Sequence, residues 1–237
     1  MQLSSYGITT LGKVRLTNED ALFISDAHQV YAVADGLGGL PGGARASQRI
    51  VELLDQTMKR VDYSEERVDL NELIKGIHQI IAKEGLKAYP FTGMGSTLTI
   101  GQIVGDQFLI GHIGDSAAYL FRGDDLQRLT IDHTMAQELI NRKGESALTD
   151  MPQEYSHTLT RCVGQGKTLQ VDSNRITIEP DDRLLLCTDG LDKVISSEAI
   201  KEELALKRSP KEACHQLTQM ANDNEGPDNI TVIVIQI

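Results

Sequence analysis

Short apolar segments rich in Val, Ile and Leu recur along the chain, and most of them are followed by Gly or Asp. Their length and composition are typical of β-strands. We expect strands at residues 20–25, 30–34, 96–104, 107–113, 117–122, 174–179, 183–188 and 229–236. Longer segments between them carry apolar residues at helical spacing. They predict helices over residues 43–60, 69–88, 197–207 and 210–223.

The order of these elements bears on the fold class. The chain runs through strands, two helices, a long block of strands, two more helices and a last strand. This grouping favours antiparallel sheets flanked by helices over a parallel βαβ sheet. Residues 141–157 have little periodicity and many turn formers, which indicates a surface insertion. A loop of that length in a compact domain is often functional.

Composition narrows the class of protein. The 237 residues carry a formal net charge of -11, so the basic surface typical of nucleic-acid binders is missing. Three widely spaced cysteines without a CxxC pair argue against a disulfide framework or a zinc site and fit a reducing compartment. No apolar segment reaches the length of a membrane span, and the N-terminus lacks a signal-peptide pattern. We therefore expect a cytoplasmic protein that binds neither nucleic acid nor membranes.

Aspartates stand at the ends of several expected strands, each in a doublet with a small or polar residue. The doublets are Asp35-Gly36, Asp115-Ser116, Asp189-Gly190 and Asp228-Asn229. One doublet alone is more often a simple turn, because Asp and Gly favour turns for conformational reasons. Four together indicate carboxylates gathered around a cation, and ligands that are all oxygen favour Mg2+, Mn2+ or Ca2+. The required spacing of an EF-hand is absent.

Eight sequence blocks containing these aspartates extend over the whole chain. They are GKVRLTNEDA at 12–21, VADGLGG at 33–39, GMGSTLTI at 93–100, IGDSAAYLFR at 113–122, LTIDHTMAQELI at 129–140, LTRCVG at 159–164, LLLCTDGLDKVIS at 184–196 and GPDNITVIVI at 226–235. In this order they resemble the protein phosphatase 2C family of metal-dependent serine/threonine phosphatases, in its compact bacterial form. Any one block is a weak motif, whereas eight in sequence are highly specific.

The resemblance implies an α+β fold, a four-layer αββα sandwich of two antiparallel β-sheets with helices on both outer faces. It implies a single phosphatase domain over residues 1–237, with residues 141–157 as a flap that contributes to substrate choice. The implied reaction is hydrolysis of phosphoserine and phosphothreonine in proteins, opposite a serine/threonine protein kinase. A monomer is our default expectation.

A centre of two or three Mn2+ or Mg2+ ions is also implied by the resemblance. Asp35 would bridge two ions, and the carbonyl of Gly36 would bind one of them. Asp189 and Asp228 would complete the ligand set together with water. Asp115 matches an aspartate that shares a weaker third ion with Asp189.

Three further residues match family positions with roles beside the metal ligands. Glu19 and Asp20 match acids that orient metal-bound water, and Arg15 matches the arginine that grips the substrate phosphate. Two cations about 3.5–4 Å apart lower the pKa of a shared water and aim it at phosphorus. A guanidinium offers a planar fork for the phosphate oxygens. No phosphoenzyme is needed, and the Cys-x5-Arg loop of tyrosine phosphatases is absent.

Three positions depart from the family pattern. Many bacterial relatives have His at the position of Leu40 and Arg at the position of Ala117. Some eukaryotic members have His at the position of Leu37, where it is thought to protonate the leaving group. The general acid is therefore unassigned, and a metal-bound water is our expectation. None of the departures removes a metal ligand, so we expect catalysis to survive.

The remaining candidates for chemistry have structural interpretations. The three cysteines lie in apolar segments and are expected in the core. His112 is also expected to be a core residue with satisfied hydrogen bonds. His133 is expected to cap a helix over 134–142. His157 lies in the insertion, and contact with substrate is the less favoured interpretation for it.

Two other functions stay open. A catalytically inactive relative would bind phosphoproteins without turnover, although such proteins usually lose a metal-binding aspartate, and Asp35, Asp189 and Asp228 are all present. A hydrolase of other phosphate monoesters or of nucleotides would use the same metal centre. The stretch GLGGLPGG at 36–43 lacks the GK[ST] ending of a P-loop.

Overall fold

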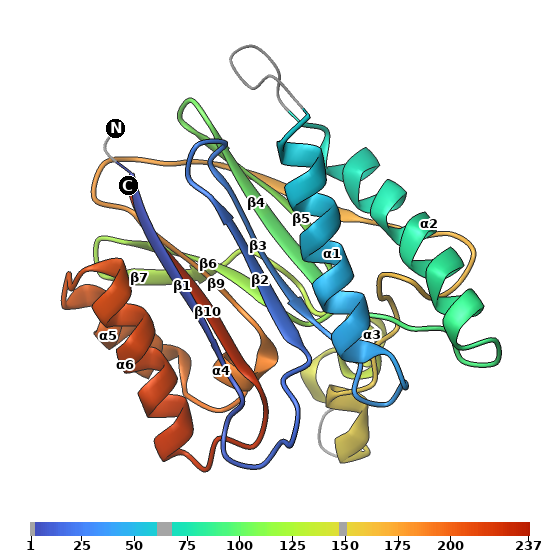
Figure 1. Cartoon of the computed structure of the whole chain (residues 1–237). Coiled ribbons are helices and arrows are strands. Elements are labelled where there is room, and N and C mark those ends of the chain that lie inside the picture. Colours follow the sequence, from blue (N-terminus) through green and yellow to red (C-terminus); the bar gives the residue numbers. More distant parts are fainter. Residues whose placement is uncertain (1–2, 61–67, 147–150) are drawn as a thin grey trace.

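Two five-stranded antiparallel sheets form the centre of the molecule (Figure 1). The structure, a computed structural model, describes residues 3–60, 68–146 and 151–237. The first sheet has the order β1 (Ser4–Thr10), β10 (Ile230–Gln236), β9 (Arg183–Cys187), β6 (Ala117–Arg122) and β7 (Asp125–Arg128). The second has the order β2 (Asp20–Ser25), β3 (Val30–Asp35), β4 (Leu98–Val104), β5 (Gln107–Ile113) and β8 (Asp172–Thr177).

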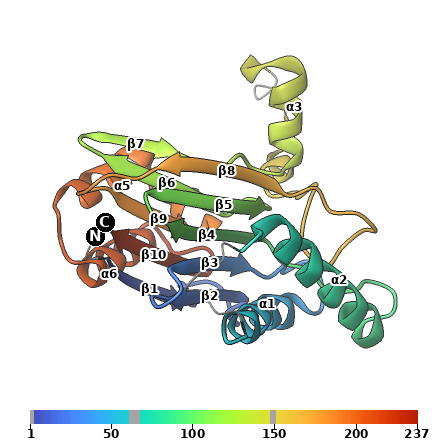
Figure 2. The same cartoon turned by 90° about the horizontal axis from the view of Figure 1, so that it is seen from above.

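Helices cover the outer face of each sheet (Figure 2). The pair α1 (Gly43–Met58) and α2 (Leu70–Ala88) packs on the second sheet, and the pair α5 (Ser197–Ala205) and α6 (Pro210–Asp223) packs on the first. Local sequence sets these helix starts, because Asp69 accepts two backbone N–H bonds at α2 and Ser209 forms a capping box with Glu212 at α6. Three further helices are α3 (Met135–Lys143), the 3-10 helix η2 (Gln153–Ser156) and α4 (Asp189–Asp192). Of these, α4 packs with α5 and α6 through its buried Leu191.

Three apolar clusters hold the layers together. One lies between the two sheets and includes Val33, Phe108, Leu184 and Ile233. The other two join each sheet to its helices, through residues such as Ile50, Ile74 and Ile100 on one side and Leu185, Ile200, Leu217 and Val232 on the other. The inner strands β3, β4, β5, β6, β9 and β10 alternate their side chains between two buried faces, and they are therefore apolar nearly throughout. The four-layer αββα fold class expected from the sequence is confirmed.

The sequence pattern does not predict β1, β7 or α4. The strands β1 and β7 are at the edges of the first sheet, each with one neighbouring strand, and are half-exposed and largely polar. The helix α4 spans only 189–192, too short for a helical period to show. Within the insertion expected over 141–157, residues 141–143 belong to α3 and 153–156 form η2, and residues 147–150 lie outside the described part.

The buried cysteines and His133 have mainly structural roles. The cysteines are free and buried, as predicted; they are Cys162, Cys187 and Cys214. The helix cap predicted for His133 is wrong, since the Thr134 side chain accepts the N–H of Gln137 at the start of α3. His133 is instead buried and accepts the N–H of Gly114 on Nδ1 at 3.0 Å. No helix in the part of the chain described here is long and apolar enough to cross a bilayer.

His112 is expected to make stability depend on pH. It is 2% exposed, with Nδ1 2.9 Å from the Thr99 hydroxyl and Nε2 3.1 Å from the Ile131 carbonyl. Burial, and then the nearby His133, lower the pKa of His112 from 6.5 to about 3. Because the unfolded chain takes up this proton below pH 6.5 and the folded chain does not, stability is lost as the pH falls from 6.5 towards 3.

The matched measurement is the free energy of unfolding of the protein and of His112→Gln between about pH 7 and pH 5, by urea denaturation. The stability advantage of the histidine protein over the variant should shrink by about 2 kcal/mol across this window. A constant difference between the two proteins would show that His112 is not held neutral in the core.

Candidate metal centre

A cavity of about 970 Å³ opens at one end of the sandwich. Every residue proposed for the site from sequence lines it except Asp20; those residues are Arg15, Glu19, Asp35, Gly36, Asp115, Asp189 and Asp228. They come from both sheets, because β3, β5 and β9 end here and β10 begins here. The cavity is also lined by residues 157–162, Gln165, Gly166, Thr168 and Leu169.

Asp35 is the last residue of β3 and is fixed by the neighbouring strand. Its backbone N–H donates to the Thr97 hydroxyl at 2.9 Å, and its carbonyl accepts the Thr97 N–H at 2.8 Å. Burial and the charges of four other aspartates raise the pKa of Asp35 well above its usual range. The next residue is Gly36, where the backbone of Gly43 leaves no room for a side chain: a Cβ at this position would lie 2.3 Å from the carbonyl of Gly43.

Asp20 lies directly opposite Asp35 in the pairing of β2 with β3. Its Oδ2 accepts the hydroxyls of Thr188 at 2.8 Å and Thr231 at 2.7 Å, which tie it to the first sheet. Its Oδ1 is buried with no hydrogen-bond partner in the protein. Burial raises the pKa of Asp20 to about 7, although the two hydroxyls oppose the shift. An unpaired buried oxygen of this kind is suited to accept a hydrogen bond from water in the site.

Asp189 is the first residue of α4, and Lys193 lies one helical turn further on. The Lys193 ammonium is 3.1 Å from Asp189 Oδ2, and His157 Nδ1 is 3.9 Å from the same oxygen. Burial alone would raise the pKa of Asp189, but His157 and Lys193 outweigh it and lower the pKa to about 2. Gly190 is required by close approach, because a Cβ here would lie 2.0 Å from the Asn229 carbonyl.

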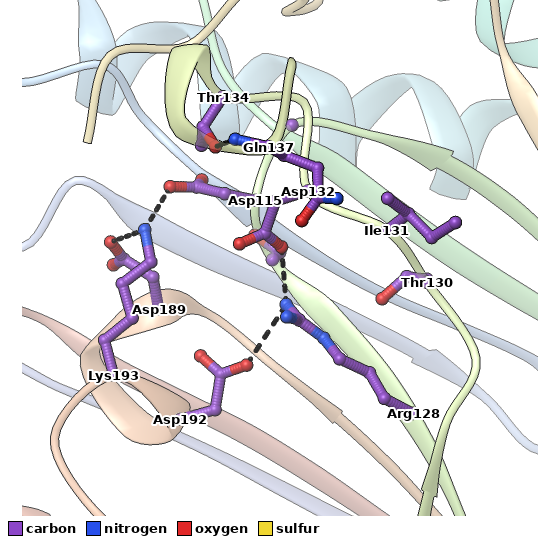
Figure 3. A network of polar contacts seen from close by, with 12 residues as sticks. Asp115, Arg128, Thr130, Ile131, Asp132, Thr134, Gln137, Asp189, Asp192 and Lys193 are labelled. Atoms are coloured by element: carbon purple, nitrogen blue, oxygen red, sulfur yellow. Dashed lines mark hydrogen bonds and ion pairs between the residues drawn. The ribbon is translucent and has the colours of Figure 1, made fainter. Parts of the chain in front are cut away.

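Asp115 lies in the turn between β5 and β6, on the other side of the same lysine. Its Oδ2 is 2.5 Å from the Lys193 ammonium (Figure 3). Burial and the charge of Asp189 raise the pKa of Asp115 to about 6 against the opposing effect of Lys193. Burial would lower the pKa of Lys193, but the two carboxylates outweigh it and raise that pKa above its ordinary value.

Asp228 precedes β10 and faces the loop that carries Arg15 and Glu19. Arg15 Nη2 donates to Asp228 Oδ2 at 2.7 Å. Asn229 holds this loop in place: its amide donates to the carbonyls of Leu11 and Thr17, and its Oδ1 accepts the N–H of Glu19 at 2.9 Å. The loop is therefore fastened to the start of β10 by one buried side chain.

The structure also places residues that the sequence interpretation left aside. Lys193 and Asn229 had no role assigned, and His157 lies at the cavity although substrate contact was the less favoured interpretation for it. Leu37 and Leu40 line the cavity, so the departures from the family pattern there put apolar groups in its wall. Ala117 is fully buried in the cluster under α5 and α6 and does not line the cavity.

The donor set suits hard divalent ions. Carboxylates from separate segments share a cavity that contains no thiol ligand other than the buried Cys162. Among the described residues, no three acidic, histidine or cysteine side chains already converge as a closed ligand shell. Arg15 and Lys193 pair with oxygens of Asp228 and Asp189, so ion binding between the carboxylates requires these cations to share or give up those oxygens.

Comparison with known proteins identifies the family. The sequence model described as protein phosphatase 2C matches residues 13–231. The serine/threonine phosphatase stp of Listeria innocua is 32% identical over 236 residues, covering 96% of this chain and 93% of that protein. The crystal structure of the Mycobacterium tuberculosis serine/threonine phosphatase PstP/Ppp superimposes with a TM-score of 0.87 at 30% identity, covering 99% of this chain and 98% of that chain.

A further structure, the PstP catalytic domain in complex with two manganese ions, superimposes with a TM-score of 0.82 at 30% identity, covering 99% of this chain and 97% of that chain. The chain belongs to the protein phosphatase 2C family. The resemblance inferred from the sequence is confirmed, and with it the class of enzyme, a metal-dependent serine/threonine protein phosphatase.

Proposed function

We propose that the chain hydrolyses phosphoserine and phosphothreonine in proteins at a centre of two divalent ions, Mn2+ or Mg2+. Asp35, the carbonyl of Gly36, Asp189 and Asp228 would hold the ions. The observation that carries the proposal is the cavity in which these groups and Arg15 come together from separate segments of the chain. The two manganese ions in the PstP complex support the metal and the number of ions.

Electrostatics supports the same ligand set. Four aspartates raise the pKa of Asp35, after burial, because their like charges disfavour a further carboxylate. Repulsion of this kind weakens the fold unless cations compensate for it, and proteins that gather carboxylates commonly bind a divalent ion between them. Binding of divalent ions between these aspartates would therefore relieve their mutual repulsion.

The surrounding side chains have distinct roles in the proposed reaction. Bound ions would supply a water of lowered pKa for attack on phosphorus. Arg15 lines the cavity, and its guanidinium has N–H groups beyond the one given to Asp228, which would bind and orient the phosphate oxygens. The unpaired Oδ1 of Asp20 would accept a hydrogen bond from a water molecule behind the metal ligands, and Glu19 would act beside it. With Leu37 and Leu40 in the wall, we assign the proton for the leaving group to water.

The size and lining of the cavity suit a phosphorylated peptide as substrate. An open cavity of about 970 Å³ accommodates a phosphorylated side chain with flanking peptide. His157 and residues 158–162 line the same cavity as Asp35, which supports a role for the end of the predicted flap in substrate choice. A monomer in the cytoplasm, acting as one phosphatase domain opposite a serine/threonine kinase, completes the proposal.

The test is hydrolysis of phosphoserine and phosphothreonine peptides by the purified protein with added Mn2+. We expect turnover that chelator removes and that Asp189→Asn lowers by more than about 100-fold, since even residues that only orient metal ligands cost 10–100-fold. Asp124→Asn, an exposed acid in the turn between β6 and β7, is the matched control and should keep full activity. Full activity of Asp189→Asn, or activity in excess chelator, would overturn the two-ion mechanism. Faster hydrolysis of small phosphate esters than of phosphopeptides would overturn the substrate class.

A further inference from the structure

A lysine ammonium occupies the space between two of the site aspartates (Figure 3). Lys193 Nζ lies 2.5 Å from Asp115 Oδ2 and 3.1 Å from Asp189 Oδ2. It also donates to the backbone carbonyl of Ser156, in η2, at 3.2 Å. An ammonium has three N–H donors, and here three oxygens accept them. The contacts are therefore those of a complete cation site whose cation belongs to the chain itself.

The backbone holds Lys193 at this place. Asp189 and Lys193 are four residues apart, and the N–H of Lys193 donates to the Asp189 carbonyl at 3.1 Å, so both side chains project from the same side of one helical turn. The turn is itself anchored, because Asp192 accepts the Tyr119 hydroxyl at 2.8 Å and lies 3.3 Å from Arg128. Figure 3 shows this second ion pair directly beside the first. The position of the ammonium follows from the fold of α4 and not from an exposed, freely rotating side chain.

The family resemblance gives this space to a weaker third metal ion, shared by Asp115 and Asp189. The residues of this chain do not fit that ion. An ion shared between Asp115 Oδ2 and Asp189 Oδ2 would have to lie where the Lys193 ammonium already contacts both oxygens. Two cations cannot share that place without strong repulsion, and Lys193 is also tied to it by the Ser156 carbonyl.

We propose that Lys193 is a built-in cation that takes the place of the third metal ion, so that this enzyme binds two ions and does not recruit a third through Asp115. The inference rests on the proposed function for the first two ions. It makes Lys193 a positioning residue: it compensates the buried charge of Asp115, holds Asp189 in orientation, and ties the Ser156 end of η2 to the metal centre.

The experiment counts Mn2+ ions bound per chain by equilibrium dialysis and elemental analysis, at millimolar free Mn2+. The protein, Asp115→Asn, Lys193→Met and the double variant are compared, with circular dichroism as the check of folding. We expect two ions in the unmodified protein and in Asp115→Asn. Lys193→Met keeps an unbranched side chain but removes the charge, and we expect it to bind a third, weaker ion that the double variant loses again.

The outcomes separate the inference from the proposed function. Absence of bound Mn2+ in the unmodified protein would contradict the proposed metal centre itself. Three ions in the unmodified protein, falling to two in Asp115→Asn, would leave that centre intact and overturn the role of Lys193. A folded Lys193→Met variant that still binds two ions would also overturn it. If Lys193→Met does not fold, the number of ions bound by the unmodified protein and by Asp115→Asn still shows whether Asp115 recruits a third ion.

Discussion

Asp35→Asn is expected to lower phosphopeptide turnover by more than about 100-fold while making the metal-free protein more stable. The loss of turnover follows from the proposed role of Asp35 as the ligand common to both ions. The gain in stability follows from its surroundings: burial and the neighbouring aspartates raise the pKa of Asp35 well above its usual range. A group whose folded-state pKa lies above its unfolded value costs stability at every pH above the unfolded value, and asparagine removes this cost.

The measurement is thermal and urea denaturation of both proteins near neutral pH, first in chelator and then with added Mn2+. In chelator, Asp35→Asn should be the more stable of the two proteins. With Mn2+ the order should reverse, because only the unmodified protein gains the free energy of ion binding. Asp124→Asn again serves as the control, with no change in either condition. A variant less stable than the unmodified protein in chelator would show that Asp35 is already compensated without metal.

The prediction of the metal-centre residues from sequence depended on where strands end. Asp35, Asp115 and Asp189 each lie at or just after the end of an apolar segment of strand length, and Asp228 precedes one. Packed sheets can therefore bring all four to the same end of the strands. Antiparallel strands alone do not fix which end, and the family blocks supplied that information. The four-layer fold was predictable for the same reason, because buried strands and amphipathic helices are strong local patterns.

Lys193 and Asn229 could not be assigned in this way. A lysine in a short turn has no periodicity that distinguishes it from a solvated surface residue, and its contact with Asp115 joins positions 78 residues apart in the sequence. One local signal was present, the four-residue spacing from Asp189 in the DGLDK block. Asn229 had only its place beside Asp228 to mark it. Its three hydrogen bonds to the Arg15 loop are long-range contacts that no local pattern contains.

Gly190→Ala is expected to cause the largest loss of stability among single substitutions near the site. Gly190 joins Asp189 to the rest of α4, and the start of β10 passes directly over it. A Cβ would lie 2.0 Å from the Asn229 carbonyl and 3.4 Å from Asp228 Cβ. Because the nearest atom belongs to backbone, no side-chain rotation relieves the clash, and the two segments must separate. We expect a cost of at least about 3 kcal/mol, the upper end of typical overpacking.

The same separation would move Asp189 away from Asp228, so weaker Mn2+ binding should accompany the loss of stability. Both are measurable, by urea denaturation in chelator and by titration of the folded variant with Mn2+. Gly76→Ala is the matched control: Gly76 is inside α2 and a Cβ there meets nothing within 4 Å. Alanine at that position should stabilise by up to about 1 kcal/mol through helix propensity. Equal stability of Gly190→Ala and the unmodified protein would show that the two ligand-bearing segments are not packed against each other.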